Sequence, residues 1–348
     1  MPTIPVGILG ATGMVGQQFV ALLTNHPWFR VSWLGASERS QGKRYRDAAA
    51  WRLSAPLADD VAGITVDEAT PGRAPQLVFS GLDSSVAGEI EAAFAQAGHT
   101  IVSNSRNHRM EQTVPLLIPE VNADHLALLA AQRAAQGWKG QIVTNPNCAA
   151  VVLAMALAPL RQFGLKATTV TTMQAISGAG YPGVASWDIL GNIIPYIGGG
   201  EEEKIETETK KVLGCLRDGR IDPHELVISA QTTRVGVPNG HTGSISVRLD
   251  QQPPVEALID AWRSFRGRPQ QLNLPSAPAE PIVYLTEANR PQPSLDVDRG
   301  RGMTVSIGRL RPCPVLDYKF IALGHNTIRG AAGAAILNAE LMSQEGLL

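Results

Sequence analysis

A glycine-rich turn follows a short apolar run in the stretch Val6-Gly7-Ile8-Leu9-Gly10-Ala11-Thr12-Gly13-Met14-Val15-Gly16. The apolar run is typical of a buried strand, and an amphipathic helix is predicted over residues 14–25. Glycines in such a turn permit a tight bend, a close approach of the backbone to a pyrophosphate, and close packing of the helix on the sheet. The helix N-terminus then faces the anion. The stretch therefore predicts the first unit of a dinucleotide-binding sheet.

The second predicted strand, at residues 31–36, ends in Ser37-Glu38-Arg39-Ser40, where the ribose of a dinucleotide is usually held. Hydroxyl groups and a guanidinium suit a 2′-phosphate, so the sequence favours NADP, while Glu38 leaves NAD open. The glycine spacing is GxxGxxG instead of the common GxGxxG. Candidate cofactor contacts are Gly10, Thr12, Gly13, Met14, Val15, Gly16, Ser37, Arg39, Ser40 and, at the end of a third strand, Ser80.

A similar glycine turn occurs in short-chain dehydrogenases, whose catalytic tyrosine stands four residues before a lysine. None of the five tyrosines of this chain has a lysine at that offset. That enzyme class is excluded.

The pattern of apolar runs predicts two domains of different class. Parallel strands at 6–9, 31–36, 77–80, 100–103 and 141–144 alternate with helices at 14–25, 86–97 and 123–136. Farther along, β-branched runs at 167–173, 226–234, 242–249, 304–310 and 316–322, with helices at 201–213 and 255–265, predict an α+β domain with a mostly antiparallel sheet. We expect a doubly wound α/β domain of residues 1–146 plus 326–348, and a catalytic and oligomerisation domain of residues 147–325.

The composition limits the partners of this chain of 348 residues. Its 30 basic and 31 acidic side chains nearly balance, so the sequence shows no basic surface for nucleic acid or membrane, and a small-molecule substrate is expected. Three cysteines without CxxC pairs and scattered histidines predict neither disulfides nor a metal site. With no secretory leader or long apolar run, the sequence predicts a cytoplasmic protein.

A single cysteine stands in Asn145-Pro146-Asn147-Cys148-Ala149-Ala150, between a predicted strand and a helix that runs to Leu157. In the first turn of a helix, unpaired N–H groups and the helix dipole stabilise a thiolate, and the same groups can hold an oxyanion. The alternative is a small buried core residue, the usual state of a free cysteine. The position predicts a nucleophile that attacks a carbonyl carbon.

Together with this turn and this cysteine, the segment Gln231-Thr232-Thr233-Arg234-Val235-Gly236-Val237-Pro238-Asn239-Gly240-His241 resembles aspartate-semialdehyde dehydrogenase. The resemblance spans nearly the whole chain. Residues 103–122 and 199–211 are similar to the archaeal and fungal branch of that family. The resemblance implies NADPH-dependent reduction of aspartyl phosphate through an acyl-thioester on Cys148.

The resemblance also implies a role for each residue that matches a family motif. His241 would be the acid/base residue, Gln174 would orient the acyl intermediate, and Arg234 would clamp the substrate carboxylate. The other implied substrate and phosphate contacts are Arg109, Lys204, Asn147 and one of Glu201 and Glu202, with Arg106 an alternative to Arg109. Ser177, Gly178 and Asn326 would contact the cofactor. A homodimer or homotetramer and inorganic phosphate are the implied partners.

Two other functions remain open on the sequence. A reductase of the same branch could act on a CoA thioester such as malonyl-CoA, since the cysteine and the hydride serve both substrates. A catalytically silent scaffold that keeps the dinucleotide fold is the alternative from another class. The joint presence of Cys148, Gln174, Arg234 and His241 argues against the scaffold, which has no physical need for all four.

Overall fold

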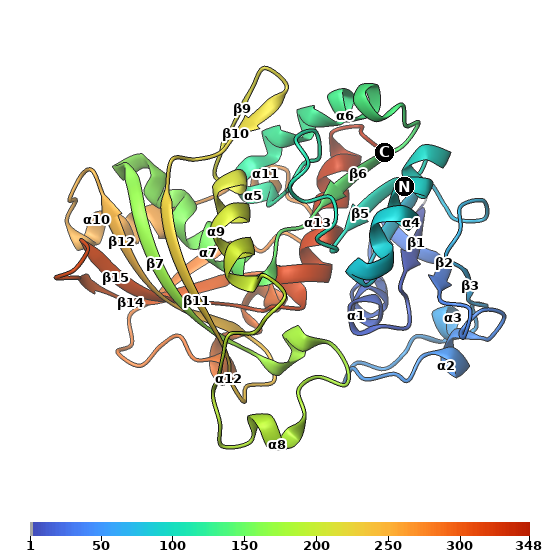
Figure 1. Cartoon of the computed structure of the whole chain (residues 1–348), viewed down its shortest axis with the longest axis horizontal. Helices are drawn as coiled ribbons and strands as arrows, with labels where there is room; N and C mark the ends of the chain where they lie inside the picture. The colour runs from blue at the N-terminus through green and yellow to red at the C-terminus, as the bar shows by residue number, and fades with distance from the viewer. Residues whose placement is uncertain (1–2) are drawn as a thin grey trace.

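The computed structural model describes residues 3–348, which form two large sheets joined by a buried helix, and a small two-stranded sheet (Figure 1). The first sheet has the order β3-β2-β1-β4-β5-β6, and all of its strands are parallel. Its strands are β1 (Ile4–Leu9), β2 (Phe29–Ala36), β3 (Asp67–Glu68), β4 (Leu77–Ser80), β5 (Thr100–Ser103) and β6 (Gln141–Thr144). The helices around it are α1 (Met14–Leu23), α2 (Tyr45–Ala48), α3 (Asp59–Ala62), α4 (Ser84–Ala97), α5 (Pro119–Asn122), the 3₁₀ turn η1 (Ala123–Ala127) and α6 (Leu128–Gln136).

Both faces of this sheet are covered, because neighbouring residues of each strand enter different cores. Ile8 and Phe79 pack with Phe19 of α1 on one face. Leu9 and Val78 pack with Phe94 of α4 on the other. This two-sided burial explains why the strands are continuous apolar runs, and it confirms the doubly wound layout.

The second sheet has the order β13-β14-β15-β12-β7-β11-β8. Only the pairs β13/β14 and β7/β11 are parallel, so the expectation of a mostly antiparallel sheet is confirmed. Its strands are β7 (Leu165–Gln174), β8 (Ile194–Pro195), β11 (Val227–Arg234), β12 (His241–Leu249), β13 (Ile282–Leu285), β14 (Val305–Pro312) and β15 (Tyr318–Gly324), with a separate hairpin of β9 (Cys215–Arg217) and β10 (Arg220–Asp222). The helices beside it are α8 (Ser186–Ile189), α9 (Glu201–Val212), α10 (Val255–Ser264), α11 (Arg268–Gln271) and α12 (Pro293–Asp296), and the 3₁₀ turns are η2 (Ala158–Phe163), η3 (Ile176–Ala179) and η4 (Arg299–Gly302).

Helix α7 (Cys148–Leu157) leaves the first sheet after β6 and packs against the second one (Figure 1). Every residue of α7 after Cys148 is buried, which fits a helix that is apolar on all sides. The chain then returns, since the π-helical turn η5 (Ile328–Ala332) and α13 (Gly333–Gln344) lie beside α1 in the first core. Across the described residues, no helix has both the length and the apolar character needed to cross a bilayer.

The sequence missed some detail around residues 266–301. Two short helices, α11 and α12, and the strand β13 between them are absent from the strands and helices that the sequence predicts. Only four residues long, β13 pairs along one side only, at the edge of the sheet, so its sequence carries little strand pattern. The predicted helix at 123–136 begins with the 3₁₀ turn η1 and becomes α-helical at Leu128.

Candidate active site

Strand ends and helix starts bring the candidate residues together. Gln174 and Arg234 are the last residues of the parallel strands β7 and β11, where they are register partners. His241 is the first residue of β12, which runs antiparallel to β7, so it begins where β7 ends. Cys148 and Glu201 open α7 and α9, which pack on each other. The fold therefore gathers residues that are up to 93 positions apart in the sequence, the separation of Cys148 and His241.

Cys148 and His241 form the centre of the site. The cysteine Sγ lies 3.2 Å from the histidine Nε2. On the other side of the ring, the backbone N–H of Ala175 donates to Nδ1 over 3.1 Å. A neutral ring that accepts at Nδ1 carries its proton on Nε2. His241 thus presents an N–H donor to the sulfur, the arrangement that stabilises a thiolate or an oxyanion at this point.

The ionisation state of the cysteine differs from the sequence prediction. Burial, followed by the negative charge of Glu201, raises the pKa of the Cys148 thiol to about 12, and Arg109 and Arg234 oppose this effect without reversing it. Burial together with Arg234 lowers the pKa of His241 to about 3. Without substrate at neutral pH, both groups are therefore uncharged. The prediction of a thiolate ionised by its helix position alone is wrong for this state.

The start of α7 explains part of that correction. Asn147 caps the helix, and its Oδ1 accepts the N–H groups of Ala149 (2.9 Å) and Ala150 (3.1 Å). Two backbone N–H groups of the first turn, which were expected to stabilise a thiolate, are thus already hydrogen-bonded to a side chain. The amide Nδ2 of Asn147 faces the site and donates to Glu201 Oε1 over 2.9 Å.

Of the two glutamates that are candidates for substrate binding, one faces the site and the other does not. Glu201 Oε1 accepts from Gln174 Nε2 at 3.2 Å, and its Oε2 lies 3.6 Å from Lys204 Nζ. Glu202 instead accepts the backbone N–H of Thr232 at 2.9 Å, which ties α9 to β11. Of the two glutamates that the sequence left open, the geometry places Glu201 beside the site and Glu202 against the sheet.

Two arginines flank the sulfur. Arg234 is 6% exposed and donates one guanidinium N–H to the carbonyl of Ala175 at 2.8 Å, and burial lowers its pKa. Arg109 is 8% exposed and keeps a buried Nε–H without a partner in the described structure. Arg106 is exposed and donates to the Gly199 carbonyl at 3.3 Å. Burial and the free Nε–H favour Arg109 over Arg106 as the ligand-binding residue.

One site residue was absent from the sequence prediction. Glu208 of α9 is 2% exposed, and it accepts from Arg109 at 3.0 Å and from the backbone N–H of Asn147 at 2.5 Å. It stands seven residues after Glu201, on the same face of the helix. The spacing Glu201, Lys204, Glu208 was available in the sequence as a signal.

The glycine-rich turn has the form that a dinucleotide phosphate requires. Gly10 has φ +70°, and a Cβ at Gly16 would stand 2.3 Å from the Gly10 carbonyl oxygen, so neither position accepts a side chain without strain. The N-terminus of α1 has no side-chain cap and no acidic residue in its first turn. Its N–H groups are available to a pyrophosphate. The residues of the turn therefore fit the cofactor.

Three other cofactor candidates form a chain of contacts next to His241. Asn326 donates to Ser177 Oγ at 2.8 Å and accepts the backbone N–H of Gly240 at 2.9 Å. A Cβ at Gly178 would stand 2.8 Å from the Arg234 guanidinium, so this glycine is in the same place. Among the ribose candidates, Ser37 and Arg39 are exposed and Ser40 is buried.

Ser80 is placed differently from the other cofactor candidates. Its hydroxyl is fully buried, and its carbonyl already accepts the backbone N–H and the side-chain amide of Asn104. The end of β4 turns this side chain into the protein interior. A direct cofactor contact through the Ser80 hydroxyl therefore has no support in the geometry.

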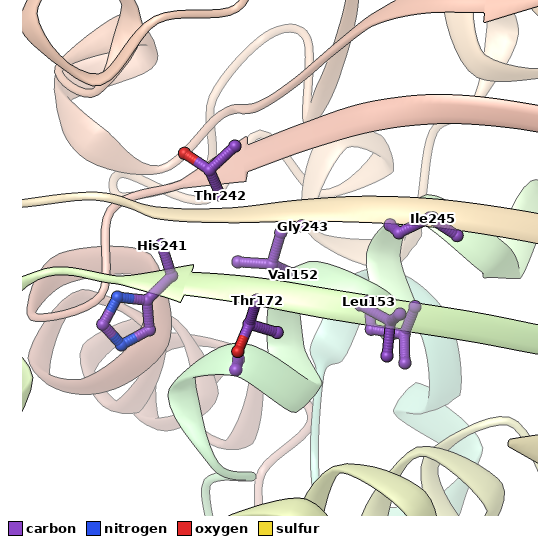
Figure 2. A pocket seen from close by; sticks show the side chains of 9 residues that line it. Val152, Leu153, Thr172, His241, Thr242, Gly243 and Ile245 are labelled. Atoms are coloured by element: carbon purple, nitrogen blue, oxygen red, sulfur yellow. The ribbon is translucent and has the colours of Figure 1, made fainter. Parts of the chain in front are cut away.

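Behind the cysteine, a narrow crevice separates α7 from β7 and β12. Figure 2 shows His241 at one end of this crevice and Val152, Leu153 and Ile245 along it. Most of its wall is hydrocarbon, so it offers a charged substrate little. The crevice therefore belongs to the apolar packing of α7 against β7 and β12, the strand that begins with His241.

Comparisons with known proteins agree with this geometry. The model of the semialdehyde dehydrogenase NAD-binding domain matches residues 5–129, and that of the semialdehyde dehydrogenase dimerisation domain matches residues 157–329. The aspartate-semialdehyde dehydrogenase of Archaeoglobus fulgidus is 46% identical over 344 residues, which cover 99% of both chains. The chain belongs to the aspartate-semialdehyde dehydrogenase family.

Further members of the aspartate-semialdehyde dehydrogenase family extend the comparison to fungi. The enzyme of Schizosaccharomyces pombe is 46% identical and covers 99% of both chains. The crystal structure of the Candida albicans enzyme with NADP has a TM-score of 0.92 and 43% identity over the full length of both chains. The resemblance seen in the sequence and its branch are confirmed. The matched dimerisation domain also supports an oligomer.

Proposed function

We propose that this chain reduces L-aspartyl 4-phosphate to L-aspartate 4-semialdehyde with NADPH, a step in the biosynthesis of aspartate-family amino acids. The observation that carries the proposal is the Cys148–His241 pair, 3.2 Å apart, with two buried arginines, Arg109 and Arg234, whose charges both act on the sulfur. Aspartyl phosphate has an anionic group at each end and an activated carbonyl between them. One arginine for each anion and a sulfur within the electrostatic reach of both arginines match that arrangement.

In the first step, Cys148 Sγ attacks the 4-acyl carbon and the bond from that carbon to the phosphate oxygen breaks. The proton of the thiol leaves with the phosphate, which is released as hydrogen phosphate. Arg109 and Lys204 hold the phosphate, and Arg234 holds the 1-carboxylate. Glu201 receives the substrate ammonium group, and Gln174 orients the acyl group.

In the second step the acyl carbon of the thioester is reduced, and NADPH, when bound, would supply the hydride and leave as NADP. The bond between that carbon and Cys148 Sγ breaks, the semialdehyde is released, and the sulfur takes up a proton. The role of His241 is to donate its Nε2–H to the negative charge that develops beside the sulfur. Because burial suppresses free charge in this site, such a preoriented donor is stronger than it would be in water.

NADP as the cofactor is supported by the uncapped N-terminus of α1 and by the crystal structure of the Candida albicans enzyme with NADP. Contacts at Gly10, Gly13 and Gly16 would be made by the backbone, and Ser177 and Asn326 would face the nicotinamide side. A contact of Arg39 with the 2′-phosphate is part of the proposal.

The assembly and the domain division are further parts of the proposal. We assign residues 1–146 plus 326–348 to the NADP-binding domain, because α13 packs with α1, and residues 147–325 to the catalytic and oligomerisation domain. Large apolar side chains exposed around α8, such as Trp187 (91%) and Leu190 (73%), support a homodimer or homotetramer. A cytoplasmic location is supported by three free cysteines.

A direct test uses the reverse reaction, in which the semialdehyde, NADP and inorganic phosphate give NADPH. We expect NADPH formation that requires phosphate. In the forward direction, aspartyl phosphate and malonyl-CoA are compared side by side. Turnover with malonyl-CoA alone would replace the proposed substrate, and a folded, reduced protein inactive with both would favour a non-catalytic role.

A further inference from the structure

Helix α9 carries two acidic or basic side chains beyond the proposed substrate contacts. Glu201, Lys204, Glu208 and Lys211 lie three or four residues apart, so they form one stripe along the helix. Glu208 and Lys211 are both buried. Neither has been given a role in the reaction above. A buried charge is costly unless it is paired, so their partners show what they do.

The Glu208 carboxylate is shared between two parts of the site. One oxygen accepts from the Arg109 guanidinium at 3.0 Å. The other accepts the backbone N–H of Asn147, one residue before Cys148, at 2.5 Å and has a longer contact of 3.4 Å with the same Arg109 nitrogen. The second terminal nitrogen of Arg109 donates to the Asn104 carbonyl at 2.7 Å. Both terminal nitrogens of Arg109 are thus held, and its Nε–H is left free.

Lys211 fixes the same loop one turn farther along α9. Its ammonium group donates to the carbonyls of Arg109 and Glu111 at 2.7 Å and to that of Val114 at 2.9 Å. Three acceptors satisfy all three protons of the ammonium. The backbone of residues 109–114 is therefore held by Lys211, while the Arg109 side chain is held by Glu208.

We propose that Glu208 is a positioning residue that sets the distance between the phosphate-binding arginine and the nucleophile. Through one carboxylate, the Arg109 guanidinium and the turn that starts the Cys148 helix are held at a fixed separation. The phosphate and the acyl carbon of the substrate are joined by a single oxygen, so their binding groups must be held in register. The inference rests on the proposed function, because it concerns the phosphate of that substrate.

Replacing Glu208 by glutamine keeps the size of the side chain and changes only its hydrogen bonding. Glu208→Gln keeps the shape but can offer only one oxygen, and its NH₂ group faces either Arg109 or the N–H of Asn147. One of the two short hydrogen bonds is therefore lost, and at most the 3.4 Å contact of Arg109 with the other oxygen position remains in its place. The matched control is Glu206→Gln on the same helix, since Glu206 Oε1 also accepts a backbone N–H, that of Ala230 at 3.0 Å, away from the cysteine.

The experiment measures the phosphate-dependent reverse reaction and, separately, the binding of inorganic phosphate by calorimetry. We expect Glu208→Gln to raise the KM for phosphate about 10-fold or more and to lower kcat by up to about 100-fold, the effect of a misplacement near 1 Å. The KM values for the semialdehyde and NADP stay within about twofold of those of the unchanged protein. Glu206→Gln leaves all constants unchanged.

Two further variants test the route through Arg109. Glu208→Asp keeps the charge but cannot reach both donors, so it too should raise the KM for phosphate. In an Arg109→Met background, Glu208→Gln should add less to the phosphate KM than it does alone, because the two residues act as one unit.

Several results would overturn the positioning role. An unchanged KM for phosphate in Glu208→Gln, or a lowered one, would reduce Glu208 to a structural residue or to an anion that competes with phosphate. Wild-type behaviour of Glu208→Asp would show that charge alone suffices. If the unchanged protein needs no phosphate for turnover, the proposed function itself fails. The calorimetric titration still reports whether Glu208 orders a phosphate site.

Discussion

Replacing Gly330 by alanine would push a methyl group into the turn that holds the proposed nucleophile. Gly330 lies in η5, and a Cβ built on it would stand 2.6 Å from the Cβ and 2.9 Å from the Cα of Cys148. Ordinary carbon contacts are about 3.5 Å or more, so η5 and the start of α7 must move apart by roughly 0.9 Å. The backbone of Gly330 is compatible with alanine, since its φ is not positive. The expected effect is therefore steric.

The shift is expected to lower both the stability of the fold and the rate of turnover. Overpacking of this kind typically costs about 1–3 kcal/mol of folding free energy. The same shift moves Sγ relative to His241 Nε2, now 3.2 Å away, and a misplacement of about 1 Å at a reacting atom costs about 100-fold in rate. Gly330→Ala is therefore expected to lose a modest part of its stability and most of its turnover.

A matched control is Gly333, the residue that directly follows η5. A Cβ there would stand 2.7 Å from the side chains of Ile328 and Met303 and 3.0 Å from the Ile328 carbonyl oxygen, and no atom of Cys148 is among these three neighbours. Gly333→Ala should lower the melting temperature by a similar amount and keep kcat near the wild-type value. The assay is kcat for phosphate-dependent NADPH formation, with the melting temperature by calorimetry. Wild-type kcat in Gly330→Ala, or equal loss of kcat in both variants, would refute the idea that η5 sets the position of the sulfur.

Other predictions follow from the charges of the site. Since burial raises the pKa of Cys148 to about 12, its alkylation by iodoacetamide in the ligand-free protein should accelerate about tenfold per pH unit from pH 7 to 10. A rate plateau near pH 7 would contradict the neutral thiol. Arg234→Lys should raise the KM for the semialdehyde at least about 10-fold, because an ammonium cannot form the planar pair with a carboxylate; steady-state kinetics that match the wild type would remove Arg234 from the substrate. Glu201→Gln should impair substrate binding, while Glu202→Gln should leave the kinetics unchanged and cost at most about 1 kcal/mol of stability, as a melting curve would show, because its neutral amide oxygen still accepts the N–H of Thr232 but more weakly than a carboxylate. Equal kinetic losses in both glutamate variants would mean that the two side chains are not separated as described.

The sequence was sufficient for the parts of the fold that repeat a local pattern. The glycine-rich turn from Gly10 to Gly16 predicts the strand before it and the helix after it, because the steric need for its glycines is local. Helix α7 extends from Cys148 to Leu157 as predicted. The edge strand Ile282–Leu285 was missed because its order comes from pairing with β14. Contacts between distant segments leave little trace in a local pattern.

The same limit applies to the site. A helix-start cysteine predicts a nucleophile, but its ionisation depends on burial and on Glu201, which is 53 residues away in the chain. The sequence offered Glu201 and Glu202 as equals, and only the pairing of Glu202 with Thr232 separates them. Glu208 was overlooked because an acid on a charged helix normally faces solvent. Its burial comes from the approach of Arg109 and Asn147.

The most direct test of the account asks whether Cys148 captures the acyl group. The protein is mixed with aspartyl phosphate in the absence of NADPH, and the modified peptide is mapped by mass spectrometry, with Cys148→Ser as the control. The account predicts an aspartyl thioester on Cys148, phosphate released in equal amount, and no adduct in the serine variant. Turnover of aspartyl phosphate without an adduct on Cys148, or with one on another residue, would contradict it.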